Sequence, residues 1–178
     1  MIQRIDSNFL INTIGASQTK FYSGRIKKWD FRFLSLAKHI ASWSKDPSTQ
    51  VGAVIADSEN RVVSVGYNGF PRGVHDTETR LNDREQKYPL TIHAEINAIL
   101  FAQKGLKDTI LYTWPFPPCD KCAGFIAQSG LQNVVSIERE RDTDLILRWK
   151  EELKRGEQVF EESQVNLRIY TREVWQEL

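Results

Sequence analysis

The sequence predicts a single α/β domain, a three-layer α/β/α sandwich around a mixed five-stranded sheet. Short apolar segments of strand length alternate along most of the chain with segments whose apolar residues recur at helical spacing. Helical segments join the last three strands to one another, which favours parallel pairing. A short polar turn joins the first two strands, which predicts an antiparallel hairpin. The 178 residues suit one domain with a substantial core.

The N-terminal region stands apart from this pattern. Residues 1–28 mix small polar residues with isolated apolar ones, and they could form an arm, an extra strand or a poorly ordered lead-in. The domain itself is predicted over 29–172 and begins with a helix at 29–43, where apolar residues return every three or four positions. Pro47 follows this helix and ends it, because proline disfavours helical conformation in the residue before it.

The remaining elements follow in a regular order. Strands are predicted at short apolar runs: 51–56, 61–68, 109–114, 133–138 and 165–171. Helices are predicted at the longer periodic segments between them: 91–105, 120–130 and 143–156. Gly105 and Gly130 are the expected ends of the first two helices. The polar connection 66–89 is long for a compact domain, which is typical of functional loops.

Composition narrows the class of protein. The formal net charge of +1 argues against a large nucleic-acid interface, which normally requires a basic excess. The first residues do not resemble a signal peptide, and no apolar run approaches the length of a membrane span. We therefore expect a cytoplasmic protein without a membrane or nucleic-acid partner. In such a reducing compartment, two closely spaced cysteines favour metal binding or catalysis over a structural disulfide.

Cys119 and Cys122 are the only cysteines of the chain, three residues apart at the start of a predicted helix. They could be a redox pair, half of a structural zinc site or part of a catalytic one. His93 begins another predicted helix, and sulfur with imidazole suits tetrahedral Zn²⁺. Three protein ligands leave one coordination position open, which is the catalytic pattern. We therefore predict one catalytic zinc per chain.

Glu95 lies two residues beyond His93, close to the expected metal without having to bind it. A carboxyl group in that position can move protons between water and substrate as a general acid and base. The spacing H-x-E followed by P-C-x-x-C is that of zinc deaminases acting on cytosine or adenine. His39 and His75 have no partner at such a spacing, and we expect them to be surface or packing residues.

Five motifs extend the likeness over about residues 29–171. They are SKDPSTQVGAVI (44–55), GYNGFPRGV (66–74), KYP (87–89), HAEINAI (93–99) and PCDKCAGFIAQSGLQNVV (118–135). In order and spacing the chain resembles the deoxycytidylate (dCMP) deaminases of the cytidine/deoxycytidylate deaminase superfamily. The resemblance implies hydrolysis of dCMP to dUMP and ammonia, a homo-oligomer, typically a hexamer, and regulation in which dCTP activates and dTTP inhibits.

The same resemblance implies nucleotide contacts around the zinc site. The backbone N–H of Ala94 is the expected donor to the carbonyl group of the base. Further substrate contacts are expected from residues that can bind phosphate or stack on the base: Ser44, Lys45, Tyr112 and Trp114. For the two aromatic residues, core packing at a strand end is an equal alternative. A regulatory nucleotide, with Mg²⁺ where it is a triphosphate, is expected at the long connection: Gly66, Tyr67, Asn68, Gly69, Arg72, Arg80, Arg84 and Lys87.

One segment departs from the pattern of the relatives. LYTWPFPPC (111–119) is one residue longer than is usual, and it forms a wall of the substrate pocket in the family. A different base or phosphate preference therefore stays open, such as deamination of dCTP or of a 5-substituted dCMP. A non-catalytic nucleotide-sensing zinc protein is the alternative from another class, although zinc binding alone does not require Glu95. The charged run 138–144 is expected to be a solvated helix start.

Overall fold

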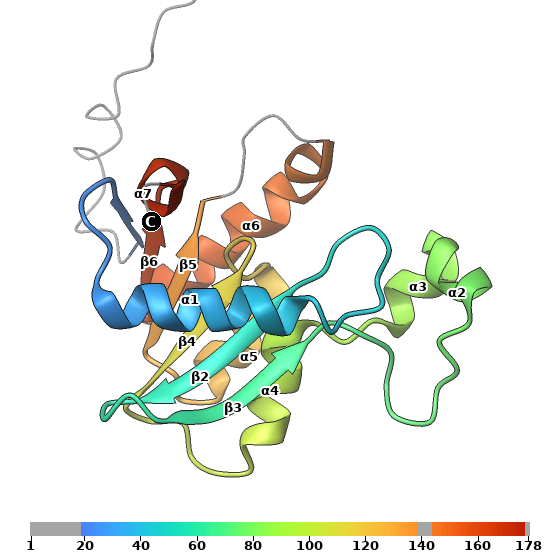
Figure 1. The fold of residues 1–178 in the computed structure, drawn as a ribbon, viewed down its shortest axis with the longest axis horizontal. Helices are drawn as coiled ribbons and strands as arrows, with labels where there is room; N and C mark the ends of the chain where they lie inside the picture. The colour runs from blue at the N-terminus through green and yellow to red at the C-terminus, as the bar shows by residue number, and fades with distance from the viewer. Residues whose placement is uncertain (1–18, 139–143, 177–178) are drawn as a thin grey trace, which may run out of the picture.

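A six-stranded mixed sheet forms the centre of the protein (Figure 1). The computed structural model describes residues 19–138 and 144–176. Across the sheet the strand order is β1-β6-β5-β4-β2-β3. The strands are β1 (Thr19–Tyr22), β2 (Gly52–Asp57), β3 (Val62–Tyr67), β4 (Thr109–Trp114), β5 (Asn133–Ile137) and β6 (Asn166–Tyr170).

The strand directions follow the prediction. β2 and β3 form the antiparallel hairpin, and β2 also pairs antiparallel with β4. β4, β5 and β6 run parallel, as expected for strands joined through helices. The predicted count of five strands is one too low, because β1 adds to the free edge of β6 in parallel. Of the three alternatives for the N-terminal region, an extra strand is therefore correct for residues 19–22.

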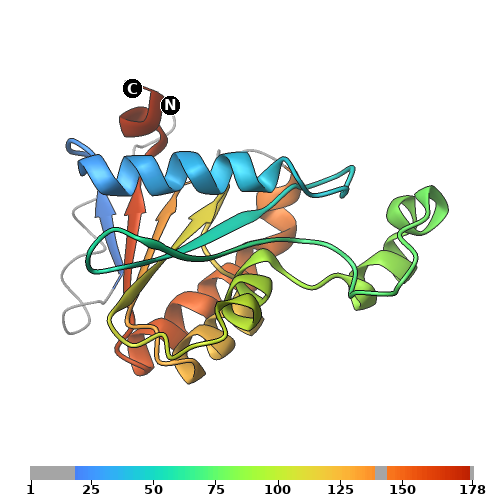
Figure 2. The same cartoon turned by 60° about the horizontal axis from the view of Figure 1, so that its bottom comes forward.

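Helices cover both faces of the sheet, which confirms the three-layer sandwich (Figure 2). One face carries α1 (Lys28–Ala41) and α7 (Arg172–Gln176), whose side chains share a core cluster. The other face carries α4 (Ala94–Ala102), α5 (Asp120–Gln128) and α6 (Asp144–Glu162). None of the described helices is long and apolar enough to cross a bilayer.

Three details of the helices differ from the sequence prediction. α4 ends at Ala102 and its C-cap residue Gln103 adopts the left-handed conformation with φ of 50°, so Gly105 is not its terminator. α6 continues six residues beyond its predicted end, to Glu162. The short helix α7 was not predicted. Of the charged run 138–144, residues 139–143 lie outside the described residues.

The long connection after β3 is partly helical. It contains α2 (Glu78–Asn82) and α3 (Arg84–Leu90), which extend away from the sheet (Figures 1 and 2). Paired hydrogen bonds between Gly69 and Ile92 close its base, with N···O distances of 3.1 and 2.9 Å. We call residues 70–91 the excursion. Its two ends return to the sheet side by side, so the helix that follows, α4, starts next to the end of β3.

Two glycines set how closely helices approach the sheet. A side chain at Gly52 of β2 would overlap the backbone of α1 at Ala37 and Ala41. A side chain at Gly66 of β3 would overlap the backbone of α4 at Ala94 and Ala98. Both helices therefore lie directly on strand backbone, one on each face, and their positions are fixed by contact rather than by long side chains.

A buried carboxylate ties α1 to the sheet. Asp30 is 3% exposed and accepts hydrogen bonds from the Tyr112 hydroxyl (3.1 Å), the Tyr170 hydroxyl (2.6 Å) and the Arg168 guanidinium (3.1 Å). Burial raises the pKa values of both tyrosines, helped by the neighbouring Asp30, so both hydroxyls stay protonated and donate. One charged side chain thus holds α1, β4 and β6 together.

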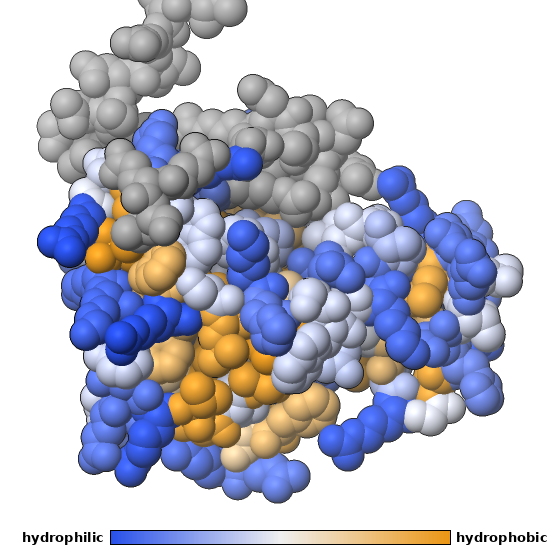
Figure 3. Space-filling model, viewed as in Figure 1, coloured by the Kyte–Doolittle hydropathy of each residue, from blue (hydrophilic) through white to orange (hydrophobic). Residues whose placement is uncertain are grey.

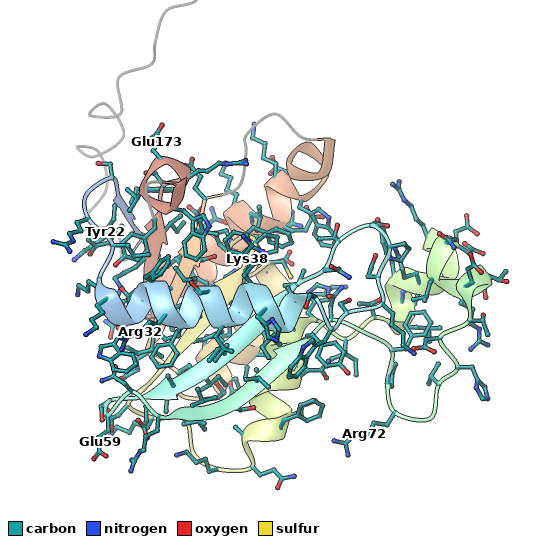
Figure 4. The ribbon with its side chains drawn as sticks, in the orientation of Figure 1. Tyr22, Arg32, Lys38, Glu59, Arg72 and Glu173 are labelled. Atoms are coloured by element: carbon teal, nitrogen blue, oxygen red, sulfur yellow. The ribbon has the colours of Figure 1, made fainter. Side chains whose placement is uncertain are left out.

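Replacing Asp30 by alanine should destabilise the fold. The substitution leaves the largely buried Arg168 without its ion-pair partner and two tyrosine hydroxyls without an acceptor. We expect the free energy of unfolding to fall by about 3 kcal/mol or more, measured by urea denaturation. Glu59 of the β2–β3 turn is the control, since it is exposed and pairs only with exposed Arg61 (Figure 4). Glu59→Ala should change the stability by less than about 0.5 kcal/mol; equal effects would contradict the role of Asp30.

Candidate active site

The predicted metal ligands meet at the starts of two neighbouring helices. His93 is the N-cap residue of α4 and Cys119 is the N-cap residue of α5, while Cys122 lies one turn further along α5. Neither N-cap side chain caps its own helix, so both are free to point between the helices. His93 Nδ1 lies 3.2 Å from Cys122 Sγ and 3.4 Å from Cys119 Sγ. The three ligand atoms all lie within 4.8 Å of one another.

This donor set fits zinc. Two unbridged thiols and one imidazole nitrogen are the ligands that Zn²⁺ prefers, and three of them leave a coordination position open. Hydrogen bonds from Cys122 and His93 lower the pKa of Cys119 to about 4, so this sulfur is a thiolate. The neighbouring thiolate and burial raise the pKa of Cys122, whose proton is released when a metal binds. Among the described residues, this is the only group of three or more such ligands.

α6 fixes the position of the α5 start. Gly156 of α6 lies against the backbone of Pro118, Cys119 and Asp120, where a methyl group would come 2.8 Å from the Pro118 carbonyl oxygen. The neighbouring Arg155 pairs with Asp120, with Nε 2.7 Å from Oδ2. α6 therefore supports Cys119 through direct backbone contact and an ion pair, and this support was not predicted from the sequence.

Glu95 lies in the first turn of α4 and is 3% exposed. Burial raises the pKa of its carboxyl group, because the charged form loses its hydration, while the nearby His93 opposes the shift. The carboxyl group interacts with Cys122, which places it beside the candidate metal ligands. A buried carboxyl group next to a metal site, with its pKa raised by burial, is suited to accept and donate protons.

A cavity of about 470 Å³ lies at the same edge of the sheet. It is lined by Asp46, Pro47, Ser48, Thr49, Gln50 and Pro115. The β2–β4 register places Gly52 opposite Trp114, so the loop before β2 and the loop after β4 leave the sheet together. The loop after β4 leads directly to Cys119. Pro115 of that loop lines the cavity, whereas His93, Glu95, Cys119 and Cys122 do not.

Of the predicted substrate contacts, Ser44 and Lys45 lie near this cavity in the loop before β2. The Ser44 hydroxyl is buried and donates to the Asn68 carbonyl oxygen at 2.8 Å. Lys45 is exposed and pairs with Asp76 of the excursion at 2.8 Å. Ala94 begins α4, where its backbone N–H belongs to the helix start that lacks intrahelical acceptors.

Tyr112 and Trp114 are not brought to the site. Both point to the α1 face of the sheet, whereas the cysteines belong to the core cluster of the opposite face. Tyr112 is 2% exposed and binds Asp30, and Trp114 packs against Trp175 with ring centroids 5.1 Å apart. Of the two alternatives, core packing describes these side chains. In the longer segment 111–119 it is Pro115 that lines the cavity.

The residues expected at a regulatory site fall into two groups: residues packed into the structure, and residues that are accessible to solvent. Gly66 lies beneath α4, and Gly69 closes the base of the excursion. Asn68 is buried, donates to the Thr49 carbonyl oxygen (2.9 Å) and accepts from the Val51 N–H (2.8 Å). Lys87 is buried and binds Asp46 (2.9 Å) and Ser48 (2.8 Å), two residues that line the cavity. The other members are more accessible: Tyr67, Arg72, Arg80 and Arg84.

Two aromatic residues at the site were not expected from the sequence. Trp149 of α6 lies against His93, with ring centroids 6.1 Å apart and an interplanar angle of 74°. Tyr88 of α3 lies on Trp149 at 6.4 Å. The available signal was the helical repeat of α6, because Trp149 lies seven residues before Gly156 and therefore on the same helix face.

An α/β/α sandwich with one histidine and two cysteines at two helix starts, and a glutamate two residues beyond the histidine, is the arrangement of the zinc deaminases. The family model described as "Cytidine and deoxycytidylate deaminase zinc-binding region" matches residues 27–138. A deaminase encoded in the luxG 3' region of Aliivibrio fischeri is 44% identical over 142 residues, which cover 80% of this chain and 93% of the relative. The chain therefore belongs to the cytidine and deoxycytidylate deaminase family.

Two further comparisons agree with this family. Human deoxycytidylate deaminase is 39% identical over 124 residues, covering 66% of this chain and 69% of that protein. The dCMP deaminase of cyanophage S-TIM5, solved in complex with dCMP and dUMP, superposes with a TM-score of 0.61. It is 22% identical and the match covers 82% of this chain and 99% of the phage protein, so it shows the shared fold.

Removing one thiol should abolish metal binding. Cys119→Ala leaves only His93 and Cys122 as ligands, too few to hold zinc against dilution. We expect elemental analysis of the purified variant to show far less than stoichiometric zinc, with the fold retained by circular dichroism. Full zinc occupancy would show that the three residues are not the ligand set.

Adding a methyl group at Gly156 should weaken metal binding without touching a ligand. In Gly156→Ala the new methyl group pushes α6 away from Pro118 and Cys119, because backbone cannot yield as a flexible side chain does. We expect zinc affinity to fall about 10- to 100-fold, measured by competition with a chromogenic chelator. Gly124→Ala on α5 is the matched control, because a methyl group there meets no neighbouring atom. Its zinc affinity should equal that of the wild type, and an equal loss in both variants would contradict the role of Gly156.

Proposed function

We propose that the protein is a zinc-dependent dCMP deaminase that hydrolyses dCMP to dUMP and ammonia. The observation that carries the proposal is the buried Glu95 beside the cluster of His93, Cys119 and Cys122. A protein that only sensed nucleotides through a zinc site would not need that carboxyl group. The identity of 39% to human deoxycytidylate deaminase supports a cytosine deoxynucleotide as the substrate.

The residues divide the chemistry between them. His93, Cys119 and Cys122 would hold zinc, which when bound supplies the Lewis acidity that makes water nucleophilic near neutral pH. Glu95 accepts the proton that water loses as its oxygen bonds to C4 of the cytosine ring, and it delivers this proton to N3. Glu95 then takes the remaining proton from the oxygen on C4 and transfers it to the exocyclic amino group, so that a carbonyl forms at C4 as the C4–N bond breaks and ammonia leaves. The N–H of Ala94 at the start of α4 binds the carbonyl oxygen of the base.

The cavity beside the loop before β2 receives the sugar and phosphate in this proposal. Its lining offers the hydroxyl groups of Ser48 and Thr49 and the amide group of Gln50. The Ser44 hydroxyl supports this loop by its hydrogen bond to Asn68. The exposed Lys45 supplies a positive charge at the edge of the cavity. Pro115, in the segment that is longer than in the relatives, limits the cavity on the side of β4.

Regulation by a second nucleotide also belongs to the proposal, with dCTP activating, dTTP inhibiting and Mg²⁺ accompanying the triphosphate. It rests on the sequence resemblance and on the exposed side chains around the excursion, which include Tyr67, Arg72 and Arg84. Figure 4 shows Arg72 at the lower end of the loop between β3 and α2. The buried Lys87 gives such a site a physical route to the substrate cavity. It links the excursion to Asp46 and Ser48 in the cavity wall.

We further propose that the protein acts in the cytoplasm as a homo-oligomer, with the hexamer favoured by the resemblance. Support comes from apolar side chains that are unusually exposed for a monomer: Val62, Leu100, Phe101 and Phe125, between 43% and 60% exposed. In Figure 3 apolar residues gather below α1, around β2 and β3. β3 is also an edge strand of the sheet, and edge strands are usually covered in stable proteins.

Glu95→Gln should remove activity while leaving the metal site intact. Glutamine keeps the shape of the buried side chain but cannot carry a proton between water and N3. We expect turnover of dCMP, followed by ammonia release, to fall at least 10²- to 10⁴-fold, with zinc content unchanged. Near wild-type turnover in this variant would contradict the role of Glu95.

The same ammonia assay tests the substrate. A panel of dCMP, dCTP, 5-substituted dCMP and cytidine, each with and without dCTP as effector, compares the alternatives directly. Preference for dCMP is the expected result. The absence of turnover on every member by the zinc-loaded wild-type protein would overturn the proposed function.

A further inference from the structure

Trp149 is the large aromatic side chain that the structure adds to the metal site. It is partly buried, and its ring lies edge-on to the ring of His93 at 6.1 Å. On its other side is Tyr88, which is 50% exposed, with ring centroids 6.4 Å apart. Three aromatic rings from α3, the start of α4 and α6 therefore follow one another from solvent to the candidate metal ligand.

The placement of Trp149 is fixed by the same contact that supports Cys119. Gly156 follows Trp149 by two helical turns, and Leu153 and Phe160 continue the same face of α6. Phe160 is fully buried in the core, and Gly156 lies on the backbone of Cys119. The ion pair of Arg155 with Asp120 sets the register between the two helices. α6 is thus held along this face, and the contact directs Trp149 to His93.

A ring in this position is suited to bind a flat base. A pyrimidine whose C4 approaches the metal must lie beside His93, because His93 is one of the three ligands. The indole ring of Trp149, whose centroid lies 6.1 Å from that of His93, offers a large apolar surface beside this ligand. Aromatic side chains bind bases by stacking and exclude water from the reacting atoms.

We infer that Trp149 forms an aromatic wall of the base-binding part of the site and contributes to the binding of the pyrimidine ring. The inference deepens the proposed function and rests on it, because it names the residue of this chain that faces the base. Trp149 acts in binding, and the proton transfers remain with Glu95. Its removal should therefore raise the Kd of a nucleotide and the KM of the substrate more than it lowers kcat.

The test compares zinc-loaded Trp149→Leu and Trp149→Phe with the wild type. Leucine keeps the apolar bulk and the fold but removes the flat ring, whereas phenylalanine keeps a ring. By isothermal titration with dUMP, the proposed reaction product, Trp149→Leu should bind about tenfold more weakly or worse, and Trp149→Phe should recover most of the affinity. The KM for dCMP should rise in parallel, with zinc content unchanged in both variants.

Trp29→Leu is the matched control. Trp29 is 41% exposed on α1, which covers the opposite face of the sheet, so dUMP binding should not change. Wild-type affinity for dUMP in Trp149→Leu would overturn the inference. Loss of zinc from this variant would also overturn it, because Trp149 would then support the metal ligand His93. A wild-type protein that binds dUMP and deaminates dCMP leaves the proposed function standing in either case. Failure of the wild type itself would overturn the proposed function and the inference together.

Discussion

Contact of helix backbone with glycine is the constraint on which the metal site depends. α4 lies on Gly66 of β3, and this contact sets where His93 begins the helix. α6 lies on the start of α5 at Gly156, and this contact sets where Cys119 stands. Zinc ligands must meet within a few tenths of an ångström, which long flexible side chains at a helix interface would not guarantee. Direct backbone contact removes that freedom, so the fold itself contributes to the position of the ligands.

Two buried carboxyl groups, one on each face of the sheet, have different neighbours and therefore different roles. Asp30 accepts hydrogen bonds from two tyrosine hydroxyls and an arginine, which bind it to β4 and β6. Glu95 lies on the other face, where burial raises its pKa and its neighbours are the metal ligands. The Asp30 carboxylate therefore holds α1 on the sheet. The second can gain and lose a proton, which is what general acid–base catalysis requires.

The sequence predicted the elements whose signals are local, including β4 with its observed bounds, the hairpin and the ligand triad. It could not assign β1, because the residues TKFY form a strand only by pairing with β6 from the far end of the chain. It left Tyr112 undecided, because strand alternation shows that alternate side chains face opposite ways but not which helix covers each face. Trp149 and Gly156 were missed for a similar reason, since their partners at the starts of α4 and α5 are distant in sequence.

These long-range contacts also join segments that lie inside and outside the span of the family match. The ligands and Glu95 come from α4 and α5, which lie within the span of the family match at 27–138. The wall next to them comes from α6, which lies beyond that span. A change at Trp149 of α6 can therefore alter the ring contact with His93 while the backbone contact at Gly156 keeps Cys119 in place. The metal ligands and Trp149 thus belong to separate segments, which meet at Gly156, at the ion pair of Arg155 with Asp120 and at the ring contact of Trp149 with His93.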